Sequence, residues 1–587
     1  MNAQSGAPRR VFEFGPFRLD MDERLLRRRD QPVQLTPKAV ELLGVLVSAG
    51  GRVVAKEALF GAVWPGVFIE ENTLSKHISM LRKALGRGYI ETISRRGYRL
   101  AAPIREPDAP VASGESPRPS AVAVLPLRNV RENPEIDYLC DGLTEQVIDC
   151  LCEIPDLRVM ARSTVFRYKG TEADPRRLKR ELSVDAVVCG QLREIDGMLE
   201  LSAELCDASD GSRVWATQLR RETTRVHEML PILAAGIAQA LRKKSPAKDT
   251  LGSPADSAAY HHYLKGLYHF NQRTTSGVMK AIEDFRRAAA ADPELALAHV
   301  GLARCYGMLP RPLVGLLSPA EARPAIETAT EKALRLDPTL PEAYVERACL
   351  KARYDWDWDS AEAEFRKALA LNPRSVLAHQ VYSSYCTSRG RFAQGQSELD
   401  LAFRSDPLSV MLRADQAFLF FFQKRYDEAI DQCLDTLDMA PDSAELHVAL
   451  GLAYQEKGDT ESALRVLERA IALSPDVTIA SALQAYNLGR LGETSKARAV
   501  ADGLIALSAE RYVSAFDIAL ARIGAGDEVG FFSWMRRACE ERSYALVLLP
   551  VFPFVDRFRR DPRFRKMFDG TGLEAGVPMP NVTARKR

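Results

Sequence analysis

The hydrophobic pattern of the first hundred residues changes its period along the chain. Short runs of alternating apolar and polar residues occupy Val11 to Asp20 and Arg24 to Leu35, which is the pattern of small antiparallel strands. A helix is predicted to begin at Thr36-Pro37, because threonine caps a helix well and proline suits its first position. The same helix is predicted to end at Gly50-Gly51.

Two more helices and a hairpin are predicted after it. The helices cover about Lys56 to Val63 and about Glu71 to Leu85, where Gly86 ends the pattern. Strand-like runs follow at Tyr89 to Ile93 and Tyr98 to Leu100. Strands followed by three helices and a C-terminal hairpin describe a winged helix-turn-helix domain of the α+β class.

The third predicted helix has an apolar face and a polar face. The apolar positions recur every three or four residues and form a stripe for the core: Leu74, Ile78, Leu81 and Leu85. The opposite face is cationic and hydrogen-bonding, without an acid: Asn72, Ser75, Lys76, Ser79, Arg82 and Lys83. Such a face suits a helix in the major groove of DNA, although a solvated surface helix shows it too. Arg95 and Arg96, adjacent at the hairpin tip, favour the DNA interpretation because they are well placed for phosphates.

These motifs together resemble the OmpR/PhoB-type winged-helix domain over about residues 10–103. The matching segments are Leu35-Thr36-Pro37, Trp64, Glu71-Asn72-Thr73-Leu74, His77-Ile78-Ser79, Leu81 to Gly86, Ile93 and Arg96 to Leu100. The resemblance implies that the third helix is the recognition helix and that the hairpin is the wing. It also implies that regulators of this type touch RNA polymerase through the loop that begins Trp64, Pro65, Gly66, Val67 and Phe68.

Two features depart from that family. Ser79 and Met80 stand where some members carry arginines, so the identity of the base contacts does not carry over. No receiver domain is expected upstream, so phosphorylation of an aspartate is not the expected switch.

The middle of the chain, about residues 120–243, is predicted to be α/β. Compact apolar runs begin at Ala121, Leu157 and Ala186, and later runs from Leu199 and Arg213 alternate like paired strands. Predicted helices lie between and after them, over Asp141 to Cys152, Pro175 to Leu182 and Val226 to Lys243.

Several pieces of this region resemble the TolB-like N-terminal domain of bacterial multidomain regulators and cyclases. They are Ala123 to Leu127, Asp141 to Glu145, Val188 with Gly190, and Trp215-Ala216. The resemblance implies an interaction or sensing module without known catalytic residues. Asp141 and Glu145 lie one helical turn apart and could form a metal or acid/base pair, but a helix-start aspartate with a solvated glutamate is the favoured interpretation.

The tail contains an internal repeat. Its prolines are separated by 45, 35, 34, 34 and 34 residues: Pro293, Pro338, Pro373, Pro407, Pro441 and Pro475. Proline stops one helix and turns the chain into the next. The clearest unit has small residues at Gly451, Ala463 and Ala470, with Tyr454 and Leu467 between them, which are tetratricopeptide (TPR) positions.

Four to seven such repeats predict an all-α solenoid with a concave, partner-binding face. The extra length before Pro338 is interpreted as an insertion around Leu309 to Pro319. The aromatic cluster of Phe418, Phe420, Phe421 and Phe422 is interpreted as packing between repeats rather than as a ligand pocket.

The expected domain organisation follows from these patterns and from two Pro/Gly-containing linkers. It comprises a winged helix at 10–103, a proline-rich linker at 104–119, a TolB-like α/β domain at 120–243, a linker at 244–257, TPR-like repeats at 258–510, and a C-terminal helical cap and tail at 511–587.

Charge is distributed unevenly along the chain, although the net charge is only +2. Residues 1–105 hold 18 Lys+Arg against 10 Asp+Glu, so polyanion binding is expected in this part. The ten cysteines have neither disulfide-framework nor CxxC spacing, and we expect reduced thiols. No apolar leader and no run of about 20 apolar residues occurs, so a cytoplasmic, nucleoid-associated protein is expected.

Three functions compete on this sequence. An enzyme is disfavoured because no phosphate loop, no GxGxxG after a strand and no HExxH is present, and no cofactor or metal is expected. A scaffold whose winged helix contacts protein is disfavoured by the cationic face. The favoured hypothesis is a transcription regulator whose architecture resembles the HilA/CadC-like branch. It would bind double-stranded DNA, possess a surface for RNA polymerase, and use its repeats for a protein partner or for self-association.

Overall fold

The computed structural model describes residues 11–105, 119–241 and 257–573, with gaps at 15–16, 22–24, 29–30, 34, 50–51, 64–70, 87–88, 94–96, 102–103, 155, 172, 312–313, 570 and 572. The chain divides into two compact units. They are residues 1–118 with 177–183, and residues 119–176 with 184–587.

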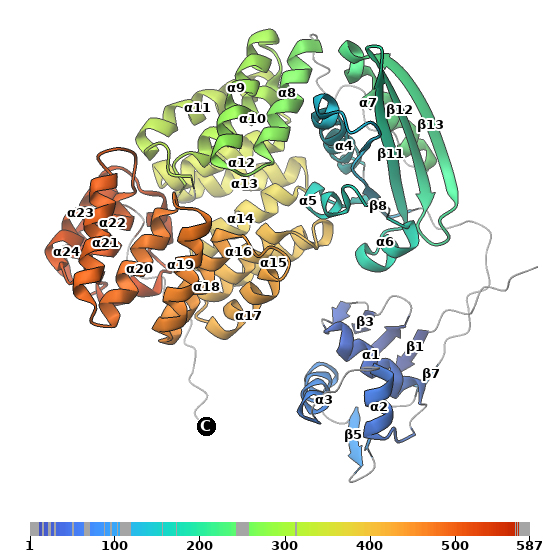
Figure 1. Ribbon diagram of the computed structural model, residues 1–587, viewed down its shortest axis with the longest axis horizontal. Helices are drawn as coiled ribbons and strands as arrows, with labels where there is room; N and C mark the ends of the chain where they lie inside the picture. The colour runs from blue at the N-terminus through green and yellow to red at the C-terminus, as the bar shows by residue number, and fades with distance from the viewer. Residues whose placement is uncertain are drawn as a thin grey trace, which may run out of the picture. The chain divides into compact units, whose positions relative to one another are not determined.

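The N-terminal unit is built on a five-stranded antiparallel sheet (Figure 1). Its strands run in the order β4-β3-β2-β1-β7: β1 (Val11–Phe14), β2 (Phe17–Asp20), β3 (Leu25–Arg28), β4 (Gln31–Val33) and β7 (Ile104–Arg105). Three helices and a hairpin lie between β4 and β7: α1 (Pro37–Ser48), α2 (Lys56–Val63), α3 (Glu71–Leu85), β5 (Ile90–Ile93) and β6 (Gly97–Leu100). The predicted helices and the C-terminal hairpin are confirmed, and each lies close to its predicted ends.

Local chemistry fixes where α1 begins. The Thr36 hydroxyl accepts a hydrogen bond from the backbone N–H of Ala39 at 3.3 Å, and Pro37 occupies the first helical position. The apolar face of α1 then packs into one core with the first strands and α3, where Leu42 and Leu46 are fully buried.

The second unit begins with a mixed sheet of six strands. They are β8 (Ala121–Val124), β9 (Arg128–Asn129), β10 (Arg158–Val159), β11 (Ala186–Ile195), β12 (Met198–Asp207) and β13 (Arg213–Glu222), in the order β10-β8-β11-β12-β13 with β9 beside β11. The pairs among β8, β10 and β11 are parallel, whereas β11, β12 and β13 pair antiparallel. The α-helices within residues 119–241 are α4 (Asp137–Cys152), α5 (Arg162–Val165), α6 (Pro175–Leu182) and α7 (Met229–Ala240). The 3₁₀ helices of the same range are η1 (Pro134–Ile136), η2 (Phe166–Tyr168) and η3 (Thr223–Glu228).

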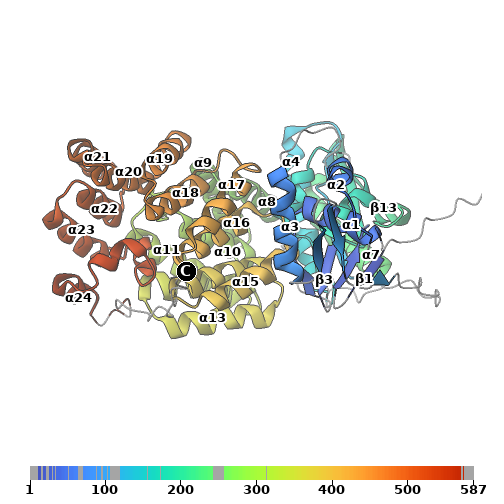
Figure 2. The ribbon, with the colours of Figure 1, turned by 90° about the horizontal axis from the view of Figure 1, so that it is seen from below.

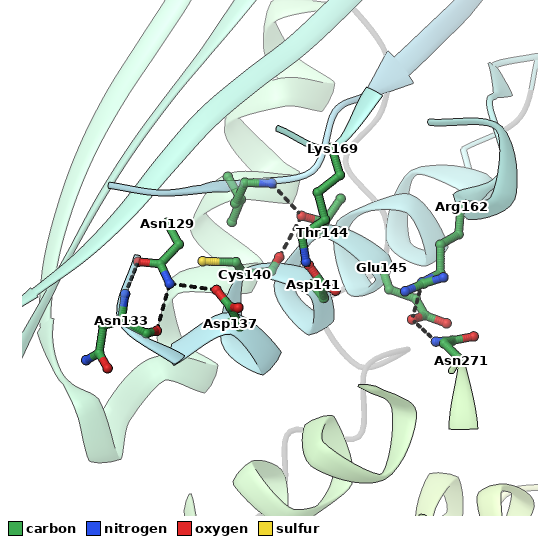
Figure 3. A network of polar contacts seen from close by, with 11 residues as sticks. Asn129, Asn133, Asp137, Cys140, Asp141, Thr144, Glu145, Arg162, Lys169 and Asn271 are labelled. Atoms are coloured by element: carbon green, nitrogen blue, oxygen red, sulfur yellow. Dashed lines mark hydrogen bonds and ion pairs between the residues drawn. The ribbon is translucent and has the colours of Figure 1, made fainter. Parts of the chain in front are cut away.

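The carboxylates of α4 form ion pairs (Figure 3). Asp141 is 5% exposed and its Oδ1 lies 2.5 Å from Lys169 Nζ. Glu145 is paired with Arg162 at 3.1 Å and accepts a hydrogen bond from the Asn271 side chain at 2.9 Å. The interpretation of a helix-start aspartate with a solvated glutamate is therefore wrong. The helix begins one turn earlier, because the Asn133–Ile136 turn leads directly into it, and both carboxylates pair across tertiary contacts that the sequence does not reveal.

Helices α8 to α23 form successive antiparallel pairs (Figures 1 and 2). Their bounds are α8 (Ser257–Phe270), α9 (Thr275–Ala291), α10 (Ala296–Met308), α11 (Pro319–Leu336), α12 (Pro341–Leu350), α13 (Trp358–Leu371), α14 (Val376–Ser388), α15 (Phe392–Ser405), α16 (Val410–Phe422), α17 (Tyr426–Leu437), α18 (Ala444–Lys457), α19 (Thr460–Leu473), α20 (Thr478–Arg490), α21 (Thr494–Leu507), α22 (Ala515–Gly524) and α23 (Glu528–Glu540). We call the even-numbered members A helices and the odd-numbered members B helices. Consecutive A helices contact one another from α8 to α22.

The periodic prolines mark the pair boundaries as predicted. The B helices α9, α11, α13, α15, α17 and α19 each end shortly before one of them. Gly451 shows why small residues are needed, since a Cβ there would lie 2.8 Å from Leu467 Cδ2 on the facing helix. The predicted insertion is also confirmed, because α10 ends at Met308 and α11 begins only at Pro319.

The C-terminal segment turns back onto the A helices. It holds η5 (Tyr544–Leu548), η6 (Pro553–Arg557) and α24 (Pro562–Phe568). The Phe552 ring lies 6.0 Å from Phe421 and 5.9 Å from Phe422 of α16, measured between ring centroids. The prediction that these phenylalanines are packing residues is confirmed, and the partner that the sequence did not reveal is the C-terminal segment.

The α/β region packs against the middle repeats through hydrogen bonds. Asp406, 2% exposed at the end of α15, accepts hydrogen bonds from the hydroxyls of Ser163 and Thr164, the latter at 2.8 Å. Arg374 donates to the carbonyl of Leu157 at 2.7 Å.

The ten cysteines form no disulfide within the described ranges, and most are buried. Every described helix falls short of the length and apolar character needed to cross a bilayer.

Candidate nucleic-acid interface

The recognition-type helix α3 is held by its apolar stripe. Leu74, Ile78, Leu81 and Leu85 are each at most 4% exposed and belong to the core of the N-terminal unit. The stripe packs against α1, so the opposite face of α3 is fixed toward solvent. The predicted core face of this helix is therefore confirmed.

The described side chains of the opposite face are accessible. Lys76 and Ser79 are exposed, and the large apolar side chain of Met80 is 38% exposed beside them. Asn72, Ser75 and Lys83 lie on the same helix, but their side chains are outside the described set. The accessible part of the face thus combines a cation, a hydroxyl and a thioether, which can meet a phosphate, a base edge and a thymine methyl group.

Arg82 has a contact that sequence reasoning missed. Its Nε donates to the carbonyl of Ile90 at 3.1 Å, and its Nη2 donates to the Thr92 hydroxyl at 2.6 Å. Both acceptors belong to β5, so the guanidinium joins the recognition-type helix to the hairpin. The one available signal in the sequence was the position of Arg82 on the flank of the polar face, eight residues before the strand.

The hairpin is also held by the loop before α2. Val54 and Tyr98 exchange two backbone hydrogen bonds, of 2.8 and 3.0 Å, and so extend the hairpin by a bridge. Gly97 has a φ of +130°, and a Cβ on it would lie 2.0 Å from the Val54 carbonyl oxygen. Glycine is needed here both for its backbone angle and for the close approach.

A lysine fixes the end of α2, where the loop toward α3 starts. Lys38 Nζ donates to the carbonyl of Val63 at 2.7 Å and pairs with Glu41 at 2.8 Å. The ammonium group thus gives a hydrogen-bond donor to a carbonyl of the last turn of α2, where a positive charge is favourable. The predicted polymerase-contact residues Trp64 to Phe68 and the hairpin-tip cations Arg95 and Arg96 lie outside the described residues.

Comparisons with known proteins bear on both ends of the chain. Residues 30–100 match the family described as "Transcriptional regulatory protein, C terminal", and residues 408–476 match "Tetratricopeptide repeat". A putative adenylate cyclase 3 of Rhizobium meliloti is 30% identical over 191 residues, which are 32% of this chain and 32% of that protein. The transcriptional regulator HilA of Salmonella typhi is 23% identical over 436 residues, 71% of this chain and 75% of HilA. The chain thus spans about a third of the first of these relatives and three quarters of the second.

Among solved structures, the DNA-binding domain of E. coli CadC is similar at 25% identity. That match covers 17% of this chain and 98% of the CadC domain, with a TM-score of 0.16. On the family matches and on the helices and hairpin described above, the N-terminal domain of this chain is a winged helix of the OmpR/PhoB type, and tetratricopeptide repeats make up much of its C-terminal half.

Proposed function

We propose that the chain is a DNA-binding transcription regulator that inserts α3 into the major groove. The observation that supports this most is the polarity of α3 within a domain of the regulator family: a fully buried stripe on one face, with Lys76 and Ser79 exposed on the other. The similarity to HilA along most of the chain points to the same activity.

The proposed contacts follow the chemistry of each side chain. Lys76, Arg82, Lys83, Arg95 and Arg96 neutralise phosphates, and Asn72, Ser75 and Ser79 face base edges. Arg82 has a second role, because the same guanidinium that contacts a phosphate also forms hydrogen bonds to strand β5 of the hairpin. The loop starting at Trp64 is the proposed contact with RNA polymerase.

We propose that the parts of the chain after the winged helix receive the regulatory signal. Residues 120–243 act as a TolB-like interaction module, and residues 258–510 with the cap at 511–587 present a surface to a protein partner or to a second copy. The linkers at 104–119 and 244–257 separate these parts from one another. Such a regulator works in the cytoplasm, where its DNA lies.

A catalytic function has less support. The similarity to adenylate cyclase 3 is confined to a third of that protein. Within the described residues, no group of three His, Cys, Asp or Glu side chains is placed to hold a metal ion. We therefore propose that the chain is a regulator without an enzymatic activity of its own.

The test is a fluorescence titration of a promoter-length duplex by the full chain over a salt series. We expect binding to weaken steeply with salt, because each neutralised phosphate contributes about −0.9 to the slope of log K against log[salt]. Lys76→Ala should reduce that slope by about 1, whereas Lys496→Ala, an exposed lysine of α21, should leave it unchanged. A salt-independent affinity, or equal slopes for both variants, would refute the proposal.

A further inference from the structure

The inner side of the repeats, lined by the A helices, is covered by two other parts of the same chain. At its N-terminal end α4 packs on α8, and Asn271 after α8 donates to Glu145 of α4 (Figure 3). Farther along, the C-terminal segment contacts α16 through Phe552 and η4 (Lys351–Asp355) through η5. A large partner would have to displace one of these segments, so the uncovered part favours a small ligand.

Around η5 of the C-terminal segment lies a group of residues that we call the inner basic cluster, made of arginines, two acids and one tyrosine. It consists of Arg273 after α8, Arg311 after α10, Arg353 of η4, Asp415 of α16, Glu445 of α18 and Tyr544 of η5. Arg273 Nη1 lies 3.6 Å from Met411 Sδ of α16, so the first and fifth helix pairs approach each other here. The guanidinium groups of Arg311 and Arg353 lie 5.7 and 4.9 Å from the centre of the Tyr544 ring.

The three arginines have no ion-pair partner in the described part of the chain. Arg273 is exposed, and Arg311 and Arg353 are half-buried, so water reaches all three. The surrounding protein, followed by the charge of Arg304, nevertheless lowers the pKa of Arg273 to about 10. A guanidinium that is crowded by protein and by other cations is stabilised when an anion binds it.

The acids of the cluster do not cancel this positive charge. Burial raises the pKa of Asp415 to about 7, although Gln380 donates a hydrogen bond to it at 2.7 Å and although Arg311 and Arg273 act on it in the opposite direction. Asp415 is therefore only partly ionised near neutral pH. Glu346 of α12 also faces Arg353 and Arg311, and burial raises the pKa of its carboxyl although both arginines act in the opposite direction. Glu445 of α18 is a third carboxylate within range of Arg273 and Arg311. Arg304 lies within electrostatic range of Glu145, Asp149 and Glu342, and burial raises the pKa of each of these carboxyls.

We propose that the inner basic cluster binds a small molecule that carries a phosphate or diphosphate group. The planar guanidinium forks of Arg273, Arg311 and Arg353 match the spacing of phosphate oxygens and can donate two parallel hydrogen bonds each. The Tyr544 ring keeps two of the guanidinium groups in place, and its hydroxyl offers a further donor. Such a ligand would bridge the first repeats to the C-terminal segment.

The experiment is isothermal titration of the full chain with inorganic pyrophosphate at constant ionic strength. We expect one saturable site per chain. Arg311→Gln and Arg353→Gln should each weaken binding about tenfold, because a hydrogen bond to a charged group is lost in each. Arg465→Gln on the exposed side of α19 is the matched control and should bind like the unaltered chain. Circular dichroism verifies that each variant is folded.

Three results would overturn the proposal. One is the absence of saturable pyrophosphate binding, and another is equal binding by Arg311→Gln and by the control. The third is saturable binding of citrate in place of pyrophosphate, which would assign the cluster to carboxylates.

Lys76→Ala must leave pyrophosphate binding unchanged, because a loss of binding in this variant would place the anion in the winged helix. DNA binding of the cluster variants without pyrophosphate tests the regulator proposal separately.

Discussion

A buried carboxylate in the C-terminal repeats makes the folded state sensitive to pH. Asp517 in the first turn of α22 is fully buried, and its Oδ2 accepts one hydrogen bond, from the Thr478 hydroxyl at 2.6 Å. The other oxygen has no partner within the described residues. Burial, together with the nearby charge of Glu541, raises the pKa of Asp517 from 3.8 to about 7, although the Thr478 hydrogen bond acts in the opposite direction. The ionised form is therefore disfavoured in the fold.

We expect Asp517→Asn to stabilise the chain above pH 7. In the unaltered chain the unfolded state loses the Asp517 proton near pH 4, whereas the folded state holds it up to about pH 7. Folding stability is thus lost as the pH rises between these values, and the amide variant does not lose it. The gain should be about 1–4 kcal/mol at pH 8 and small at pH 4, and thermal unfolding across this range measures it.

Asp502→Asn on the exposed side of α21 is the control for that measurement. Its carboxylate is 57% exposed and pairs with Arg522 at 3.1 Å, so its effect should be small at every pH. If the difference in free energy of unfolding between Asp517→Asn and the unaltered chain stays constant from pH 4 to pH 8, the effect does not come from ionisation of Asp517.

At the scale of elements, the recognition-type helix and the hairpin behave as one body. Arg82 joins α3 to β5 through two hydrogen bonds, and Gly97 lets β6 approach Val54. The position of strands β5 and β6 relative to α3 therefore depends on the Arg82 side chain and on the close backbone approach at Gly97.

We expect Arg82→Gln to loosen the hairpin while α3 stays in place. The variant loses two hydrogen bonds made by a charged donor, which corresponds to about 1.5–3 kcal/mol of local stability. Hydrogen exchange of the β5 and β6 amides should become faster, while exchange of the buried face of α3 should not change. Arg52→Gln is the control, since Arg52 is exposed in the same domain and its Nε donates to the Ala49 carbonyl at 3.2 Å rather than to the hairpin. If hydrogen exchange in the hairpin of Arg82→Gln is unchanged, the two hydrogen bonds of Arg82 do not stabilise the hairpin.

At the scale of the whole second unit, the α/β region and the repeats share a buried polar contact. Asp406 accepts hydrogen bonds from two hydroxyls of α5, and Thr164 also accepts from the backbone N–H of Leu408 at 3.1 Å. A buried carboxylate with several donors fixes the orientation of the elements that supply them.

We expect Asp406→Ala to uncouple the unfolding of the α/β region from that of the repeats. Two hydroxyls lose their charged acceptor, and the Thr164 hydroxyl is buried, so the cost should be about 1.5–3 kcal/mol. Calorimetry should then resolve a separate transition at lower temperature. Asp442→Ala is the control, because Asp442 is 77% exposed and pairs with Arg469 on the surface of the repeats. A single transition at the unaltered Tm would argue against the coupling.

The elements and their order could be predicted from local patterns in the amino-acid sequence. Periodicity in residues 36 to 85 is local, since caps such as Thr36 and stripes such as Leu74 to Leu85 act within one helix. The regularly spaced prolines act in the same way, because each one ends a helix wherever that helix packs. This is why the winged helix and the repeats could be predicted from the residues and why the family matches agree with them.

The contacts between side chains of distant segments became known from the folded structure and could not be predicted. Arg82 with β5, Glu145 with Asn271, and Phe552 with α16 join segments whose separation in the sequence carries no periodic signal. The position of Asp141 inside α4 escaped prediction for the same reason, as its partner Lys169 lies 28 residues away. Local propensity fixes what each segment becomes. Which segments come together depends on shape and on the pairing of buried polar groups across the folded chain.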